Sequence, residues 1–267
     1  MKDLRGKLAL VTGASSGIGE AIAIALAQAG TNLILCARDA GRLAQVQQRC
    51  IALGVQAEAQ IADVADEAQM QALAEAVHAR HAAIDILINN AGVVMGGLCW
   101  EVEAEDWRRL HEINVMGVVH GIRAFVPKMI ARSSGGHIVN MASVSGFVGA
   151  PGMATYSASK FAVMGLSESL RADLYRHRIG VSTICPGFVK TPIQSKVKLV
   201  GTLDTPRGRA RVDRDFAKTT LLPETVAQRT LSAIRNNLST VGVGREARIA
   251  LGLKRWAPAL LERFTRG

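Results

Sequence analysis

The segment KLALVTGASSGIG (residues 7–19) passes from a short apolar run into a glycine-rich stretch. The run KLALVT predicts a buried strand, and a helical pattern begins near Gly17. Glycines at positions 13, 17 and 19 let the backbone turn tightly, and the N–H groups at a helix N-terminus favour an anionic group. The segment therefore predicts a phosphate-binding turn between a strand and a helix. An ordinary β–α turn is the alternative.

Short apolar segments alternate with longer helical patterns along the rest of the chain. Strands are expected at residues 7–12, 32–37, 55–60, 84–89, 136–141, 180–185 and 240–244, and helices near 17–29, 40–53, 66–81, 103–132, 155–177 and 223–237. Several strands are continuously apolar, as in parallel sheets that helices cover on both faces. The alternation predicts an α/β fold in a single domain (residues 1–267), a Rossmann-type doubly wound parallel sheet of about seven strands with helices on both faces.

The composition indicates a folded globular protein. Of its 267 residues, 49% are hydrophobic and 20% are charged, and the net charge is +10. The four cysteines lie far apart without the spacing of a metal site, so we expect free thiols. The basic residues are spread out and form no recognisable nucleic-acid module, which argues against a nucleic-acid partner. Since we find neither a membrane-spanning segment nor an apolar signal core, we expect a cytoplasmic protein.

Arg38 follows the end of the expected second strand at Ala37. Ligands of doubly wound sheets bind at the carboxyl ends of the strands. Proteins selective for NAD commonly place an acidic residue at this strand end, whereas an arginine suits charge-assisted recognition of a 2′-phosphate. Arg38 therefore favours NADP(H) over NAD(H), and the next residue, Asp39, could serve as a helix N-cap. The alternative is an Arg38 that is only solvated.

Ser143 and the segment YSASK (residues 156–160) form the strongest chemical pattern. Tyr156 and Lys160 are four residues apart and share one helix face. A phenol is a poor proton donor or acceptor at neutral pH unless its pKa is tuned, and a neighbouring ammonium favours the phenolate. Alone, such a pair is more often a surface pair than a catalytic one. Its meaning depends on the residues that accompany it.

Taken together, these motifs resemble those of the short-chain dehydrogenase/reductase family. The matching residues, in the family's order, are Thr12-Gly13-x-x-x-Gly17-x-Gly19, Asp63-Val64, Asn89-Asn90-Ala91-Gly92, Asn114, Ser143, Tyr156-x-x-x-Lys160 and Pro186-Gly187 with Thr191. Each motif is weak, but their ordered co-occurrence over some two-thirds of the chain is highly specific. The resemblance implies hydride transfer between NADP(H) and a carbonyl or secondary alcohol, with no metal.

The resemblance also implies roles for individual residues. Tyr156 would be the general acid in reduction and the base in oxidation, and Ser143 would orient the substrate oxygen. Lys160 would lower the pKa of Tyr156 and bind the nicotinamide ribose, and Asn114 would hold a water of the proton relay. Beside Tyr156 and Lys160, the implied cofactor residues are Gly13, Ser15, Ser16, Gly17, Ile18 and Gly19 at the pyrophosphate, Arg38 at the 2′-phosphate, Asp63 and Val64 at the adenine, Asn90, Ala91 and Gly92 at the ribose, and Pro186, Gly187, Val189 and Thr191 at the nicotinamide.

The substrate is less clearly indicated than the reaction. Mostly apolar residues fall near the presumed pocket, although packing explains each equally well: Val94, Met95, Ser145, Phe147, Met153 and Phe188. We expect a small-molecule substrate, a fairly apolar ketone or alcohol, and a specificity-shaping lid at residues 188–222. Lys190, Lys196 and Lys198 in this segment could attract an anionic acyl carrier, so a 3-oxoacyl thioester reductase is the alternative. A non-catalytic dinucleotide-binding sensor is a second alternative, although the catalytic set is intact.

The C-terminal extension (residues 245–267) departs from the family's pattern, because its usual closing Val-Asp-Gly-Gly is missing. Pro258 should divide it into two short helices. A basic amphipathic stripe runs through it, made of Ile249, Leu253, Trp256, Leu260 and Phe264 with basic residues beside them. The stripe either packs on its own domain or a sister subunit, or makes peripheral contact with an anionic membrane surface. The family resemblance implies a homodimer or homotetramer, formed through the helices at 103–132 and 155–177.

Overall fold

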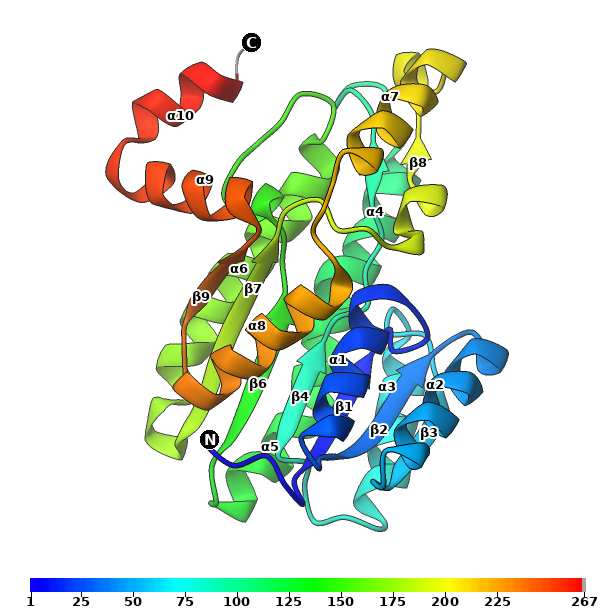
Figure 1. Cartoon of the computed structure of the whole chain (residues 1–267), viewed down its shortest axis with the longest axis vertical. Helices are drawn as coiled ribbons and strands as arrows, with labels where there is room; N and C mark the ends of the chain where they lie inside the picture. The colour runs from blue at the N-terminus through cyan, green and yellow to red at the C-terminus, as the bar shows by residue number, and fades with distance from the viewer. Residues whose placement is uncertain (266–267) are drawn as a thin grey trace.

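Seven parallel strands form the main sheet of the structure, a computed structural model that describes residues 1–265 and, among them, the side chains of residues 1–261. The strands are β1 (Leu8–Thr12), β2 (Asn32–Ala37), β3 (Ala57–Ile61), β4 (Ile86–Asn89), β6 (Gly136–Met141), β7 (Ile179–Pro186) and β9 (Thr240–Val243). Their order across the sheet is β3-β2-β1-β4-β6-β7-β9 (Figure 1). The predicted doubly wound, single-domain fold is confirmed, and each strand end lies within two residues of its expected position.

Helices cover both faces of this sheet (Figure 1). One layer contains α1 (Gly17–Gln28), α2 (Ala40–Ala52) and α8 (Pro223–Asn236), and the other contains α3 (Glu67–His78), α5 (Gly117–Arg132) and α6 (Ala154–Asp173). Successive strand residues alternate between the layers. Val11 and Leu35 pack in the first layer, whereas Leu10 and Ile34 pack in the second. Because both faces are buried, the strands are continuously apolar, as the sequence predicts.

The strand order reverses between β1 and β4. Thr12, at the end of β1, and Asn90, directly after β4, join the two strands at this point. The Asn90 backbone N–H donates to Thr12 Oγ1 over 3.0 Å, and Asn90 Nδ2 donates to the Thr12 carbonyl over 2.9 Å. Since ligands of doubly wound sheets bind where the strand order reverses, these bonds fix the frame of the expected site.

Two segments differ from their expected secondary structure. The helix expected at 103–132 is α4 (Ala104–His111), a π-helical turn η1 (Glu112–Met116) and then α5. The expected lid, residues 188–222, contains η4 (Pro192–Lys196), η5 (Gly201–Leu203), α7 (Pro206–Ala217) and a short strand β8 (Lys198–Leu199) that pairs with β5 (Met95–Gly96). No residue of α7 is buried, and half of the residues in its sequence PRGRARVDRDFA are charged, so no pattern of a buried helix face indicates it in the sequence.

The C-terminal segment forms α9 (Arg245–Trp256) and α10 (Pro258–Thr265), divided at Pro258. Helix α9 packs on the domain through the buried Ala247 and the partly buried Leu251. The residues of the predicted stripe take no part in this contact. Ile249, Trp256 and Leu260 are exposed, and Leu253 is half-buried. The side chain of Phe264 lies outside the described part of the chain. Packing on its own domain, one expectation for the stripe, is therefore wrong for its exposed members, because α9 turns a different face inward.

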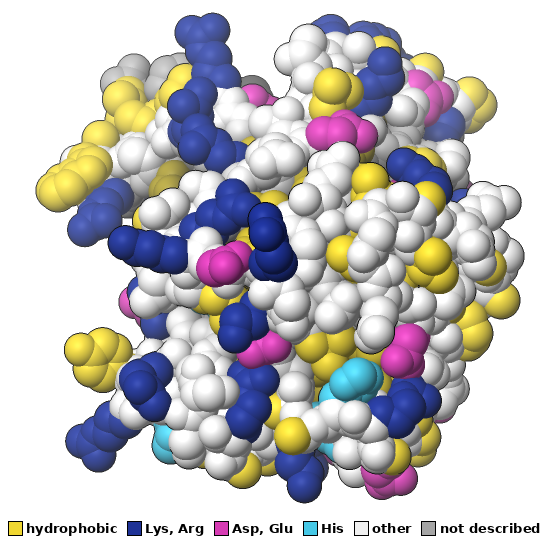
Figure 2. Space-filling model, turned by 60° about the horizontal axis from the view of Figure 1, so that its bottom comes forward, with side chains coloured by type: hydrophobic (Ala, Val, Ile, Leu, Met, Phe, Trp, Pro, Cys, Tyr) yellow, Lys and Arg dark blue, Asp and Glu magenta, His cyan; other side chains and the backbone are white. Residues whose placement is uncertain are grey.

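Basic side chains are spread widely over the surface. On the face shown in Figure 2, most of the Lys and Arg side chains lie on the left of the view, from top to bottom. Acidic and uncharged groups lie between them. At the upper left, where the C-terminal helices lie, basic and hydrophobic side chains are mixed (Figure 2). None of the helices within the described part of the chain is both long and apolar enough to cross a membrane.

His137 on β6 predicts how stability responds to acid. The ring is 1% exposed, its Nε2 lies 2.8 Å from Ser182 Oγ, and burial, with the positive charges of the N-terminus and Arg171, lowers its pKa from 6.5 to about 3. Between these pH values the unfolded chain binds a proton that the native protein does not, so stability falls as pH falls. At pH 4.5 this effect amounts to about 2–3 kcal/mol.

We expect His137→Gln to remove most of this pH dependence, measured as the difference in unfolding free energy between pH 7.5 and pH 4.5 in urea titrations. His177→Gln makes the same substitution at an exposed histidine and serves as the control, which should keep the wild-type pH dependence. An equal loss of stability at pH 4.5 in wild type and His137→Gln would show that His137 is not the responsible group.

Candidate active site

The turn between β1 and α1 leaves backbone N–H groups open at the edge of the sheet. Gly13 has a φ of +64°, which favours glycine. A Cβ on Gly19 would lie 2.3 Å from the Gly13 carbonyl oxygen, so the helix packs closely only because no side chain is present there. The N-cap residue of α1, Ser16, makes no side-chain capping bond. The first N–H groups of α1 are therefore available to an anion, as a phosphate-binding turn requires.

A cavity of about 910 Å³ extends from this turn along the carboxyl ends of the strands. Nearly all residues predicted to bind the cofactor lie in its wall: Gly13, Ser15, Ser16, Gly17, Ile18, Arg38, Asp63, Val64, Asn90, Ala91, Gly92, Tyr156, Lys160, Pro186, Gly187, Val189 and Thr191. Gly19 lies behind the wall, where it packs against Gly13. The structure thus brings together in one cavity segments that are far apart in the sequence.

Ser143 and Tyr156 lie in the cavity wall beyond the cofactor end. Ser143 follows β6 and caps the short helix η2 (Val144–Gly146), where its Oγ accepts from the Ser145 N–H over 3.2 Å. Tyr156 is in the first turn of α6. Burial raises the pKa of Tyr156, and a hydrogen bond with Ser143 opposes this rise. At neutral pH the phenol is therefore protonated, which is the state that can donate a proton.

Lys160 lies one turn further along α6, with its Nζ 5.8 Å from the centre of the Tyr156 ring. The side chain is buried and donates to the Met141 carbonyl over 3.0 Å. Burial lowers the pKa of Lys160 to about 8, so the ammonium form still predominates at pH 7. We expected this ammonium to lower the pKa of Tyr156. In the structure, burial of the phenol outweighs any such effect.

Asn114 is almost fully buried in the π-helical turn η1. Its Oδ1 accepts from the Val93 N–H over 2.9 Å, and its Nδ2 donates to the Val93 carbonyl and to Ser159 Oγ. A Cβ on Gly92 would lie 3.1 Å from Asn114 Oδ1 and 3.4 Å from Lys160 Nζ. Asn114 thus fixes the segment after β4 beside Lys160. Its part in a proton relay stays a prediction.

The substrate end of the cavity contains four of the six residues expected there: Val94, Ser145, Met153 and Phe188. The other two expectations are wrong. Met95 is buried against Val102 and Leu110, because its strand β5 turns this side chain inward. Phe147 is buried in a separate cluster with Val163, because η2 directs it toward α6.

The expected lid contributes residues that the sequence does not single out. Arg211, Val212, Asp215 and Phe216 of α7 line the cavity, and the ring of Phe216 meets that of Phe188 edge to face at 5.4 Å. The three lysines near the start of the lid are placed differently. Lys196 lines the cavity, Lys198 pairs with Asp106 on α4, and Lys190 is exposed outside the cavity wall.

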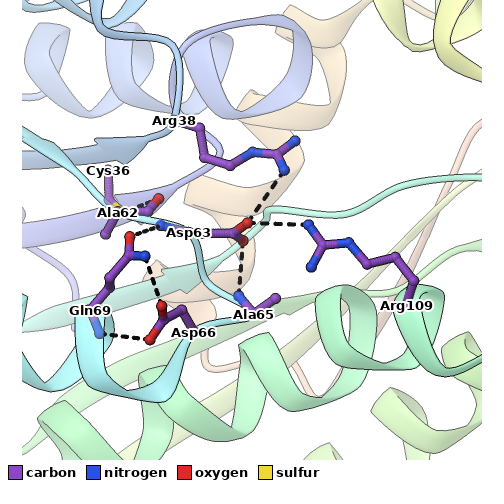
Figure 3. A network of polar contacts seen from close by, with 8 residues as sticks. All are labelled: Cys36, Arg38, Ala62, Asp63, Ala65, Asp66, Gln69 and Arg109. Carbon is purple, nitrogen blue, oxygen red and sulfur yellow. Dashed lines mark hydrogen bonds and ion pairs between the residues drawn. The ribbon is translucent and has the colours of Figure 1, made fainter.

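Arg38 lies at the opposite, cofactor end, where the Asp63 carboxylate faces both Arg38 and Arg109 (Figure 3). Asp39 caps α2, as expected, by accepting from the Arg42 N–H over 3.0 Å. Arg109 comes from α4, 46 residues after Asp63, and nothing in the sequence pattern indicates this pairing. Within the described part of the chain, no cluster of histidine, cysteine and acidic side chains could hold a metal ion.

Comparisons with known proteins agree with this arrangement. The family model described as short chain dehydrogenase matches residues 7–199. The chain is 40% identical over 192 residues to 1-deoxy-11-beta-hydroxypentalenate dehydrogenase of Streptomyces avermitilis. These residues make up 71% of each protein.

Solved structures extend the similarity over nearly the whole chain. A short-chain dehydrogenase/reductase of Burkholderia phymatum in complex with NAD has a TM-score of 0.87 at 35% identity, covering 97% of this chain and 96% of that one. L-Sorbose reductase of Gluconobacter frateurii, complexed with NADPH and L-sorbose, has a TM-score of 0.80 at 30% identity. The match covers 91% of this chain and 97% of the reductase. The chain therefore belongs to the short-chain dehydrogenase/reductase family and is an oxidoreductase of that family.

Proposed function

We propose that this oxidoreductase transfers a hydride between NADP(H) and a carbonyl compound or secondary alcohol. One observation carries the proposal: a single cavity is lined by the phosphate turn and Arg38 at one end and by Ser143, Tyr156 and Lys160 at the other. The open N–H groups of α1 and the close approach at Gly13 fit a dinucleotide pyrophosphate. When bound, the nicotinamide supplies or accepts the hydride.

The protein's own residues manage the substrate oxygen and its proton. In reduction, the protonated Tyr156 donates its phenolic proton to the oxygen as the carbonyl carbon gains the hydride, and Ser143 holds that oxygen by a hydrogen bond. The phenolate left on Tyr156 is stabilised by the Lys160 ammonium, which is buried beside it. Oxidation of an alcohol runs the same transfers in reverse, with the phenolate as the base.

Arg38 supports NADP(H) as the preferred cofactor. Its side chain is 61% exposed at the cofactor end of the cavity, where a 2′-phosphate could reach it. Asp39, which could otherwise accept from a ribose 2′-hydroxyl, is engaged as the N-cap of α2 and pairs with Arg42. One solved relative contains NAD and another NADPH, so family membership alone does not decide between them.

The substrate end supports a fairly apolar ketone or alcohol. Its wall combines side chains from the β4–α4 segment, η2, α6 and the lid, among them Val94, Met153, Phe188, Val212 and Phe216. Burial of apolar surface would supply most of the binding free energy for such a substrate.

A 3-oxoacyl thioester is the second candidate substrate, because two basic side chains lie in the same wall. Lys196 and Arg211 line the cavity, and neither forms an ion pair with the described residues. Asp215 on the same helix offsets part of this charge. A substrate with an anionic end beyond its carbonyl would place that end against Lys196 and Arg211.

Tyr156→Phe should lower turnover by about 10³-fold, because the substituted ring lacks the hydroxyl that donates its proton to the carbonyl oxygen. The dissociation constant of NADPH should change less than about twofold. The measurements are NADPH absorbance with a panel of ketones and a fluorescence titration of NADPH. Tyr175→Phe, at the chain's other tyrosine and 83% exposed, should be fully active. Undiminished turnover in Tyr156→Phe would overturn the mechanism.

Arg38→Asp should weaken NADPH binding by about 10- to 100-fold and leave NADH binding within a few-fold, because only NADPH carries the 2′-phosphate. Isothermal titration with both cofactors gives the ratio of affinities. Arg80→Asp, which makes the same charge change beside Glu58 on β3, is the control and should not alter the ratio. The assignment fails if the ratio in Arg38→Asp equals that of the wild type.

Lys196→Gln separates the two substrate candidates. It should lower kcat/KM for a 3-oxoacyl thioester by about two- to fivefold, as expected for one partly exposed charge contact, and leave a neutral apolar ketone unaffected. Lys190→Gln, outside the cavity wall, is the matched control. If the wild type reduces only neutral ketones and Lys196→Gln changes nothing, the thioester candidate is excluded.

A further inference from the structure

Two arginines, Arg38 directly after β2 and Arg109 on α4, share one carboxylate oxygen at the cofactor end of the cavity (Figure 3). Arg38 Nη1 lies 3.4 Å from Asp63 Oδ2, and Arg109 Nη2 lies 3.2 Å from the same atom. The side chain of Asp63 is 23% exposed, whereas those of Arg38 and Arg109 are 61% and 52% exposed. The carboxylate is therefore the fixed member of this group, and the arginines are the members that can move.

Asp63 is held by its surroundings on the other side. Its Oδ1 accepts from the Ala65 N–H over 3.0 Å, and its own N–H donates to Gln69 Oε1 over 2.9 Å. Gln69 is in turn bound to Asp66, the N-cap of α3 (Figure 3). Burial tends to raise the pKa of Asp63, but the Ala65 N–H and the two arginines lower it overall, so the carboxylate is ionised at neutral pH.

Arg38 and Asp63 line the cavity, whereas Arg109 stands behind it. If a 2′-phosphate binds Arg38, as the proposed function requires, the guanidinium turns part of its donor edge away from Asp63. Asp63 then faces an added phosphate charge with one cation fewer. Arg109 stays on the same oxygen and offsets that charge. The exchange is easy because the Arg38–Asp63 contact is long and largely exposed.

We propose that Arg109 is a positioning residue for cofactor choice: it holds Asp63 so that Arg38 is released to the 2′-phosphate of NADP(H). The inference rests on the proposed preference for NADP(H) and goes beyond it, because it assigns part of that preference to α4. Without Arg109, Asp63 would retain Arg38 as its only cation and would repel the 2′-phosphate. NADH carries no such phosphate, so its binding does not require Arg38 to move.

The test compares dissociation constants of NADPH and NADH for the full chain by isothermal titration. Arg109→Gln should weaken NADPH binding by about two- to fivefold, the range of a partly exposed ion pair, and leave NADH binding unchanged. Arg109→Lys keeps the charge and should restore most of the NADPH affinity. Arg108→Gln changes the same charge on the neighbouring exposed residue of α4 and should bind both cofactors like the wild type.

Equal weakening of both cofactors in Arg109→Gln would overturn the inference, since Arg109 would then only support the loop at Asp63. Unchanged NADPH binding in Arg109→Gln would also overturn it. A wild-type protein that binds NADH as tightly as NADPH would overturn the proposed cofactor together with this inference. A preference for NADPH that depends on Arg38 but not on Arg109 would leave the proposed function intact and remove only the role of α4.

Discussion

A line of buried side-chain amides and hydroxyls at the carboxyl edge of the sheet holds the site together. Asn89 on β4 donates to Asn140 on β6, and Asn140 donates to Ser167 on α6, each over 2.9 Å. On the other side of β4, Asn90 binds Thr12 at the end of β1. These bonds are short, and those between β4, β6 and α6 are fully buried, so breaking one leaves an unpaired polar group inside the protein. They connect the glycine turn after β1 to α6, the helix that carries Tyr156 and Lys160.

This rigidity matters because the catalytic chemistry depends on burial. Burial shifts the pKa values of Tyr156 and Lys160 in opposite directions. It raises the pKa of the phenol and lowers that of the ammonium, because in each case it favours the neutral form. Donation of the phenolic proton creates a negative charge beside the buried ammonium, and each charge then stabilises the other. The ammonium therefore offsets part of the free-energy cost of forming a phenolate in this buried position.

The sequence predicted the parts of the molecule that depend on local patterns. The continuously apolar strands, the glycine turn and the spacing of Tyr156 and Lys160 are local, and their positions in the structure agree with expectation. Features that depend on how distant segments meet were not predictable. Arg109 reaches Asp63 only through the packing of α4, and the highly charged helix α7 has no buried residue that would mark it in the sequence. Met95 and Phe147 belong to segments that border the cavity, but their side chains point into buried clusters instead. The direction of each side chain depends on tertiary packing.

The same division separates the residues proposed for the chemical step from those proposed for selectivity. The polar line and the buried tyrosine–lysine pair support the proposed proton transfer, and all of these residues lie near the carboxyl edge of the sheet. The groups that would choose a cofactor or a substrate lie at or near the two ends of the cavity, on Arg38 after β2, on Arg109 of α4 and on side chains of the lid. Substituting an exposed charged side chain has little effect on the stability of the fold, because such a charge contributes little to it. Selectivity can therefore change at these ends while the central chemistry and the fold that holds it stay the same.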